Sequence, residues 1–285
     1  MKRTPAIAIL LLLVAVLGVG CATMSLLETV ESLIQQAKEL LDARRFDEAL
    51  AKLTEAIRRD PTQWKAYLYT AQAYIGKLDW TAALTNIRKA RELAPSDGAV
   101  LATLGESLFG AGREALQRGT FAGAVGHFVE YVKLRPADAA GYLNAGRAYL
   151  GTRNWGDAVH VLSDGLGRAS DPTARQEFAR TLLDGGRQAL SLGEARGAIG
   201  LLREYVRQEP ADVAAYLNLG KAYVNAGEHI EALGAFRRVL ELAPQNEEAR
   251  RFLLGRWPAA AMSRPGTGTR RRPTGSGASR RPSSA

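Results

Sequence analysis

Hydrophobic and small residues recur along the middle of the chain at the spacing of paired amphipathic helices. Helix-like segments end on prolines, and the interval from Pro61 to Pro95 equals the interval from Pro210 to Pro244. An alanine stands twelve positions before each helix-ending proline, at Ala49, Ala83, Ala124, Ala198 and Ala232. A fixed period of about 34 residues predicts stacked helical repeats.

Close helix packing explains the small residues. Two antiparallel helices approach closely only where one of the facing side chains is Gly or Ala, and Ala37, Ala71, Gly146 and Gly220 recur at such a place. Each unit leaves an apolar face that its neighbour covers. We expect a helical domain over 30–257, with units at about 30–63, 64–97, 98–138, 139–171, 172–212 and 213–246 and a capping helix at 246–256.

Two units are longer than the others. The extra residues of the third and fifth units lie around GAGREALQRG and DGGRQALSLG, and six or seven residues are close to two helical turns. We therefore predict two extended first helices. Aligning 112–150 with 186–224, an offset of 74, gives 21 identities in 39 positions, so units three and four look like a copy of units five and six.

The repeated motif resembles a known family. AGYLNAGRAY at 140–149 and AAYLNLGKAY at 214–223 are similar to the first-helix pattern of the tetratricopeptide repeat, a helix-turn-helix of about 34 residues. The second-helix pattern is represented by Ala49, Leu53, Ala56, Ala83, Ile87, Ala90, Ala232 and Phe236. This resemblance implies an all-α fold, a right-handed α-solenoid of antiparallel helix pairs with about six repeats.

The basic character of the chain comes from its two ends. The net charge is +9, but Lys2 and Arg3 begin the chain, and six arginines without any acid lie in 258–285. Of 38 basic residues, 30 therefore remain against all 29 acids, and the body of the chain is close to neutral. A pI near 9.8 would otherwise suggest nucleic acid as a partner. We expect no nucleic-acid partner.

Residues 1–20 read as an export signal. A basic start is followed by the uncharged run 6–20, which is short for a membrane span. The run ends at Cys21, the only cysteine, and LGVGC resembles the lipobox of bacterial lipoproteins, although Gly18 departs from it. The resemblance implies lipidation of Cys21, followed by a linker at 21–29. Cleavage by an ordinary signal peptidase and an uncleaved anchor remain alternatives.

This resemblance also implies a location. Ala22 is not the aspartate that retains many such lipoproteins at the inner membrane. We therefore expect an exported protein, lipid-anchored to the cell envelope on the periplasmic face of the outer membrane. The segment 258–285 is rich in Arg, Pro, Gly and Ser and lacks apolar periodicity, so it is predicted to be a disordered tail.

No pattern in the chain indicates catalysis. One cysteine and three histidines do not suggest a metal centre, and no phosphate-binding loop or hydrolase motif is present. Glu130 and Glu204 occupy identical places in the two copies and are expected to form salt bridges or helix-surface contacts. The sequence predicts no catalytic site, no metal and no cofactor.

The family resemblance implies a ligand groove lined by first helices. The family's ligand-contact positions carry over to Lys38, Leu68, Gln72, Leu143, Asn144, Arg147, Leu217, Asn218 and Lys221. Leucines under cations and amides suit an extended peptide that carries an acidic residue or a terminal carboxylate. Glu106 stands in the corresponding place of the third unit and interrupts the row of cations.

Two functions follow from these expectations. The first is a non-catalytic, membrane-anchored scaffold that binds envelope proteins and supports the assembly of secretion, pilus or cell-wall machinery. The alternative is a structural protein that forms homo-oligomers through its long helices or its convex face.

Overall fold

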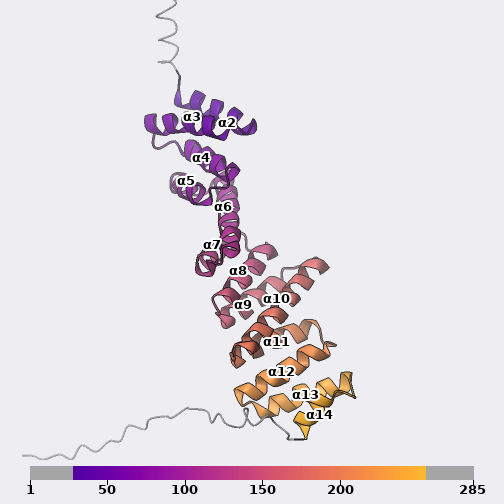
Figure 1. Cartoon of the computed structure of the whole chain (residues 1–285). Helices are drawn as coiled ribbons and strands as arrows, with labels where there is room; N and C mark the ends of the chain where they lie inside the picture. The colour runs from indigo at the N-terminus through magenta and orange to yellow at the C-terminus, as the bar shows by residue number, and fades with distance from the viewer. Residues whose placement is uncertain (1–27, 255–285) are drawn as a thin grey trace, which may run out of the picture. The chain divides into compact units, whose positions relative to one another are not determined.

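Helices account for nearly all of the chain that the structure describes. The structure is a computed structural model that describes residues 28–254, and it contains no strand within them. The helices are α2 (Val30–Asp42), α3 (Phe46–Arg59), α4 (Trp64–Gly76), α5 (Trp80–Leu93), α6 (Gly98–Gln117), α7 (Phe121–Leu134), α8 (Ala139–Gly151), α9 (Trp155–Leu166), α10 (Pro172–Ser191), α11 (Ala195–Gln208), α12 (Val213–Ala226), α13 (His229–Leu242) and α14 (Glu247–Leu253) (Figure 1).

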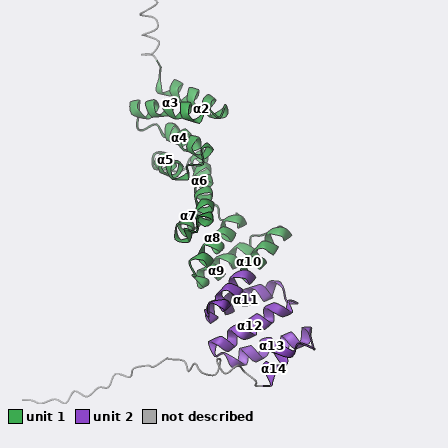
Figure 2. Ribbon diagram, in the orientation of Figure 1, with its two compact units in different colours: residues 1–182 green, residues 183–285 purple. Residues whose placement is uncertain are grey.

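The chain divides into two units. Unit 1 comprises residues 1–182 and unit 2 comprises residues 183–285, with the division inside α10 (Figure 2). Within unit 1, α2 packs on α3, α4 on α5, α6 on α7 and α8 on α9. Within unit 2, α11 packs on α12, and α13 packs on both α12 and α14. Helix pairs of this kind confirm the all-α repeat fold that the sequence predicts.

The two extended first helices are present. Helices α6 and α10 each contain 20 residues, whereas the other first helices, α2, α4, α8 and α12, contain 13 or 14. The extra turns of α6 run through Gly110 to Gln117. This extension lengthens one face of unit 1, and that face carries the cavity described below.

Prolines end the helices, and acids or amides two residues later begin the next ones. The side chain of Asp97 accepts hydrogen bonds from the backbone N–H groups of Ala99 and Val100 at 2.9 and 3.0 Å. The same capping contact is made by Asp138, Asp212 and Asn246. These caps satisfy N–H groups that have no partner inside the helix, so each Pro-x-Asp or Pro-x-Asn sequence fixes a helix boundary.

Glycine in a first helix faces a large side chain in the second helix. A Cβ at Gly112 would lie 2.7 Å from Cζ of Phe128, and one at Gly146 would lie 2.3 Å from Cδ2 of Leu162. In unit 2, Gly186 faces Leu202 and Gly220 faces Phe236 in the same way. Phenylalanine and leucine therefore exchange places between the two copies of the repeat, while the glycines stay.

The turns between paired helices contain one residue with a left-handed backbone. This residue is Gly119, Gly193 or Gly227 in three turns, and Arg44, Leu78 or Arg153 in the other three, each of these last with φ of 59°. A residue other than glycine loses about 1 kcal/mol of conformational free energy in this conformation, because its Cβ approaches the backbone. Leu78 is the apolar residue among them, and its side chain is 67% exposed.

The last described helix covers the end of unit 2. Asn246 caps α14, as expected, and Phe252 stacks on Phe236 with ring centroids 4.3 Å apart. The helix spans Glu247–Leu253, which is shorter than the predicted 246–256. Trp257, the predicted export segment 1–20, Cys21 and the predicted tail 258–285 lie outside the described residues. Between residues 28 and 254, no helix is long and apolar enough to cross a membrane.

Candidate functional site

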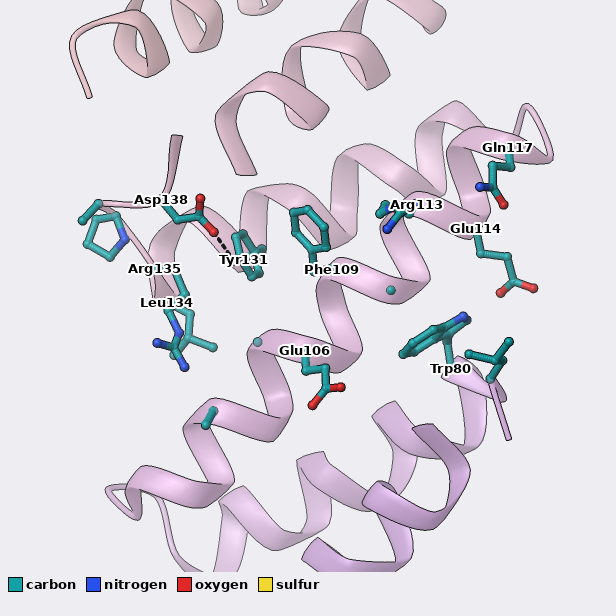
Figure 3. A pocket seen from close by; sticks show the side chains of 16 residues that line it. Trp80, Glu106, Phe109, Arg113, Glu114, Gln117, Tyr131, Leu134, Arg135 and Asp138 are labelled. Atoms are coloured by element: carbon teal, nitrogen blue, oxygen red, sulfur yellow. Dashed lines mark hydrogen bonds between the residues drawn. The ribbon is translucent and has the colours of Figure 1, made fainter. Parts of the chain in front are cut away.

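A cavity of about 1060 Å³ lies along α6 in unit 1. Its lining follows the helix from Ala102 to Gln117. Trp80, at the start of α5, stands at one end of this lining, and Leu134 at the end of α7 stands at the other with residues 135–138 of the α7–α8 connection (Figure 3). We call this cavity the α6 groove.

Aromatic side chains form the middle of the α6 groove. The ring centroid of Phe109 lies 5.1 Å from that of Tyr131 and 5.8 Å from that of Phe128, the latter in an edge-on arrangement. Aromatic pairs prefer such tilted and edge-on geometries. The arrangement fixes the ring of Phe109, which Figure 3 shows at the centre of the lining residues.

A glycine allows one end of the α6 groove to approach the helix. A Cβ at Gly110 would lie 2.3 Å from Cζ3 of Trp80, so the indole ring rests directly on the backbone of α6. A Cβ at Gly105 would lie 3.4 Å from Nε of Arg135. The absence of a side chain at Gly110 lets Trp80 fold in against the helix, whereas the contact of Arg135 at Gly105 is an ordinary van der Waals approach.

Three charged side chains of the α6 groove have no internal partner. Glu106, Arg113 and Arg135 are exposed, and their side chains form no hydrogen bond or ion pair with another residue of 28–254. In contrast, Glu114 pairs with Arg118 at 2.7 Å. The groove therefore offers two cations and one carboxylate to a ligand beside its aromatic floor.

A tyrosine–aspartate contact holds the α7–α8 connection in place. The hydroxyl of Tyr131 donates a hydrogen bond to Asp138, which also caps α8. The same contact recurs in unit 2, where Tyr205 donates to Asp212 at 2.8 Å. Burial, followed by this hydrogen bond, raises the pKa of Tyr131 to about 12, and the pKa of Tyr205 is raised to about 12 in the same way.

The raised pKa of these tyrosines predicts a loss of stability in strong base. The folded state holds the phenol proton more tightly than the unfolded chain, whose pKa is near 10, so the contribution is complete below pH 10 and falls away as the pH rises toward 12. We expect Tyr131→Phe/Tyr205→Phe to be less stable than wild type by about 1 kcal/mol per lost hydrogen bond at pH 8. Urea unfolding from pH 8 to 12 should show this difference shrinking; a difference that stays constant to pH 12 contradicts the assignment.

The long polar side chains predicted from the sequence as ligand contacts, three cations and one amide, are distributed over both units. Lys38 is exposed on α2, and Nε2 of Gln72 donates to the hydroxyl of Thr103 at 3.4 Å. Arg147 forms an ion pair with Glu177 at 3.2 Å, and Lys221 forms one with Glu248 at 2.8 Å. The first pair links α8 to α10 and the second links α12 to α14, which are the first helices of the repeats that follow. Each of these two cations therefore already has an internal carboxylate.

Two of the three leucines predicted to contact a ligand are buried in the structure. Leu68 and Leu143 are 3% and 7% exposed, and Leu68 packs in a core cluster with Val100 and Leu104 of the next first helix. They therefore belong to the core and offer little surface to a ligand. Leu217 is partly exposed, as are Asn144 and Asn218, and the amide of Asn144 donates to the carbonyl of Ala140 at 2.9 Å.

None of the nine predicted ligand-contact residues lines the α6 groove. Sequence reasoning set Glu106 aside because it interrupts the row of cations. The signal that was present is the spacing of Glu106, Phe109 and Arg113, which places these three residues on one face of a helix. Among residues 28–254, no group of three or more His, Cys, Asp and Glu side chains is arranged to hold a metal ion.

Comparisons with known proteins give one clear family match. A family model of the tetratricopeptide repeat matches residues 34–98, 109–174 and 183–247. Serine/threonine-protein phosphatase T of Trypanosoma brucei brucei is 29% identical over 104 residues, which are 36% of this chain and 21% of that protein. The chain therefore spans about a fifth of this curated relative.

Solved structures include similar helical arrays. A chain of the Naa15/Naa10 complex bound to HypK-THB matches with a TM-score of 0.48 and 18% identity, over 80% of this chain and 34% of that chain. A tetratricopeptide repeat protein from Parabacteroides merdae matches with a TM-score of 0.43 and 13% identity, over 79% of this chain and 97% of that chain.

Proposed function

The chain belongs to the tetratricopeptide-repeat family, and from this premise we propose that it is an interaction scaffold that holds a segment of a partner protein in the α6 groove. Matches to the family model cover well over half of the chain. Stacked helix pairs of this family serve as protein-interaction modules, which supports a binding role without chemistry. The similarity to the phosphatase is confined to 21% of that protein, so it supplies no argument for phosphatase activity.

The observation that carries this proposal is the composition of the α6 groove. Phe109 and Trp80 provide apolar surface, and Arg113, Arg135 and Glu106 stand beside it without a partner among residues 28–254. An apolar centre with a polar, charged rim is typical of surfaces that bind other proteins. Side chains whose charges are not paired inside the protein can pair with a ligand without first breaking an internal contact.

Photocrosslinking tests the scaffold proposal. Benzoylphenylalanine placed at position 106 of the full chain lies in the α6 groove, and the same group at Thr85 lies on the exposed surface of α5 as a control. We expect irradiation to crosslink position 106, but not position 85, to a protein other than this chain. Products made only of two copies of this chain would refute the scaffold and support the self-oligomerising alternative, in which long helices or the convex face mediate assembly.

The second part of the proposal concerns location. We infer that the chain is exported, is lipidated at Cys21 and is held on the periplasmic face of the outer membrane, where its partners are envelope proteins of secretion, pilus or cell-wall assembly. The support is the sequence alone: the basic start, the uncharged run 6–20 and the small residues before Cys21.

Metabolic labelling with palmitate tests the anchor. Wild type is expected to incorporate label and to remain with the membrane fraction, whereas Cys21→Ser loses the label because it removes the only thiol. Wild type that takes up no label would exclude lipidation and leave signal cleavage or an uncleaved segment.

A further inference from the structure

Leu78 has a combination of properties that packing does not explain. It has φ of 59°, in a turn position that is glycine in three of the other units, and its side chain is 67% exposed. A leucine there bears both a backbone cost and the cost of apolar surface in water. Backbone strain of this kind often accompanies a functional site. Leu78 also lines the α6 groove, where an apolar ligand would cover it.

Leu78 completes an apolar strip at one side of the α6 groove. Trp80 rests against the backbone of Gly110, and Phe109 lies one residue earlier on α6. Figure 3 shows the ring of Phe109 between Tyr131 on one side and Trp80 on the other. A large aliphatic or aromatic side chain of a ligand would find apolar surface from two elements here, α6 and the start of α5.

The free charges are spread along the length of the same groove. Arg135 stands toward one end, Glu106 between the ends, and Arg113 toward the other end, on the far side of Phe109 (Figure 3). Asp138 and Glu114 also line the groove, but their carboxylates are already bound, Asp138 by the hydroxyl of Tyr131 and the N–H of Ala140, and Glu114 by Arg118. Arg113 and Arg135 are therefore the cations that can pair with acidic residues on both sides of an apolar residue of a ligand. Glu106 can accept hydrogen bonds from backbone N–H groups of an extended segment.

The length of the groove sets the length of the segment. From Ala102 to Gln117 the helix rises by about 22 Å, at 1.5 Å per residue. An extended chain of about seven residues covers this distance at roughly 3.3 Å per residue. The extra turns of α6 provide part of this length.

The corresponding positions of the second copy carry different chemistry. At the offset that aligns 112–150 with 186–224, Glu106 is replaced by Arg180, Gly110 by Asp184 and Arg135 by Glu209. The charges at two of these positions are thus reversed, and a charged side chain replaces the glycine on which Trp80 rests. The preference derived from Arg113 and Arg135 therefore belongs to the first copy alone.

We propose that the α6 groove binds an extended segment of another protein in which acidic residues flank a large apolar side chain. The apolar side chain contacts Leu78, Trp80 and Phe109, and the acidic residues pair with Arg113 and Arg135. This inference rests on the scaffold function proposed above and adds the chemistry of its ligand. The chain's own segment 258–285 is a poor occupant, because it contains six arginines and no acid.

Synthetic peptides test this proposal on the full chain. The probes are dye-labelled Glu-Asp-Gly-Phe-Gly-Asp-Glu, a form with lysine for each acid and a form with serine for phenylalanine, followed by fluorescence anisotropy. The acidic probe is expected to bind at least tenfold more tightly than either other form, and more weakly at high salt. Equal or tighter binding of the lysine form overturns the proposal.

Variants locate the contact. Arg113→Glu and Arg135→Glu are expected to weaken binding of the acidic probe at least tenfold, because each replaces an attraction by a repulsion. Arg187→Glu is the matched control, since Arg187 occupies the place of Arg113 in the second copy. An unchanged affinity in both groove variants, or an equal loss in the control, overturns the assignment.

Leu78→Gly separates a binding role from a structural one. Glycine relieves the left-handed backbone, so the melting temperature is expected to equal or exceed that of wild type while the affinity for the acidic probe falls severalfold. Unchanged affinity would remove Leu78 from the site. If the peptide probes do not bind but position 106 still crosslinks to a protein other than this chain, the scaffold proposal holds and the proposed ligand chemistry is wrong. If neither the probes nor the crosslinker finds a partner, both proposals are wrong.

Discussion

Phe128→Ala is expected to lower the free energy of unfolding by about 3 to 5 kcal/mol. The ring of Phe128 is fully buried, lies against Gly112 of α6 and meets Phe109 edge-on at 5.8 Å. Glycine at 112 has no side chain with which to fill the space, so truncation leaves a cavity between α6 and α7. Urea unfolding followed by far-ultraviolet circular dichroism measures the loss.

Two further variants of α7 control this experiment. Phe128→Leu introduces the residue that stands at the equivalent place of the second copy, Leu202, and is expected to cost less than about 1.5 kcal/mol. Lys133→Ala changes an exposed residue of the same helix and should stay within about 0.5 kcal/mol of wild type. A loss below about 1 kcal/mol for Phe128→Ala contradicts the packing described here.

Gly165→Leu is expected to destabilise unit 1 by about 3 kcal/mol. A Cβ at Gly165 would lie 2.5 Å from the ring of Phe178 and 2.6 Å from Cβ of Tyr142, so three helices, α8, α9 and α10, would have to separate. Overpacking of a filled interior costs about 1 to 3 kcal/mol or more, and a leucine is four heavy atoms larger than glycine.

The same helix provides the control. A Cβ at Gly156 meets no atom of the described residues within 4 Å, so Gly156→Leu should keep or raise stability, by up to about 1 kcal/mol from better helix propensity. The two substitutions are chemically identical and lie on α9. Melting temperatures that shift in the same direction for both would contradict the close approach at Gly165.

The fold was predictable because each rule acts locally and recurs. The spacing of helix-ending prolines gave the repeat, and the surplus near GAGREALQRG and DGGRQALSLG gave the two helices of 20 residues. Glu130 and Glu204 form the expected salt bridges, with Arg88 at 2.8 Å and with Arg207 at 2.6 Å respectively. The small residues of the first helices also lie where packing requires them.

The candidate site was not predictable in the same way. It combines Leu78 of the α4–α5 turn and Trp80 of α5 with Glu106 and Arg113 of α6 and Arg135 of the α7–α8 connection. Nothing in the sequence indicates which of these charges lack a partner among residues 28–254. Carrying family positions over one by one also takes no account of the repeat that follows each site. The following repeat buries Leu68 in one case, and in another its Glu177 forms an ion pair with Arg147.

A comparison of the two copies of the double repeat distinguishes residues that packing requires from residues that determine surface charge. The glycines opposite large side chains, the tyrosine–aspartate contacts and the helix caps recur in both copies. At the groove positions, Glu106 and Arg135 of the first copy correspond to Arg180 and Glu209 of the second. The skeleton is thus shared, and the charged surface differs.

Nuclear magnetic resonance tests the central claim, that the α6 groove is the interaction surface, most directly. The acidic probe peptide is titrated into the isotope-labelled full chain, and changes in amide chemical shift are mapped by residue. We predict changes in chemical shift at 78–80, at 106–113 and at Arg135. The changes should be larger for residues that lie closer to the bound apolar side chain. Changes centred on Lys38, Arg147 or Lys221, with none along α6, would contradict the account.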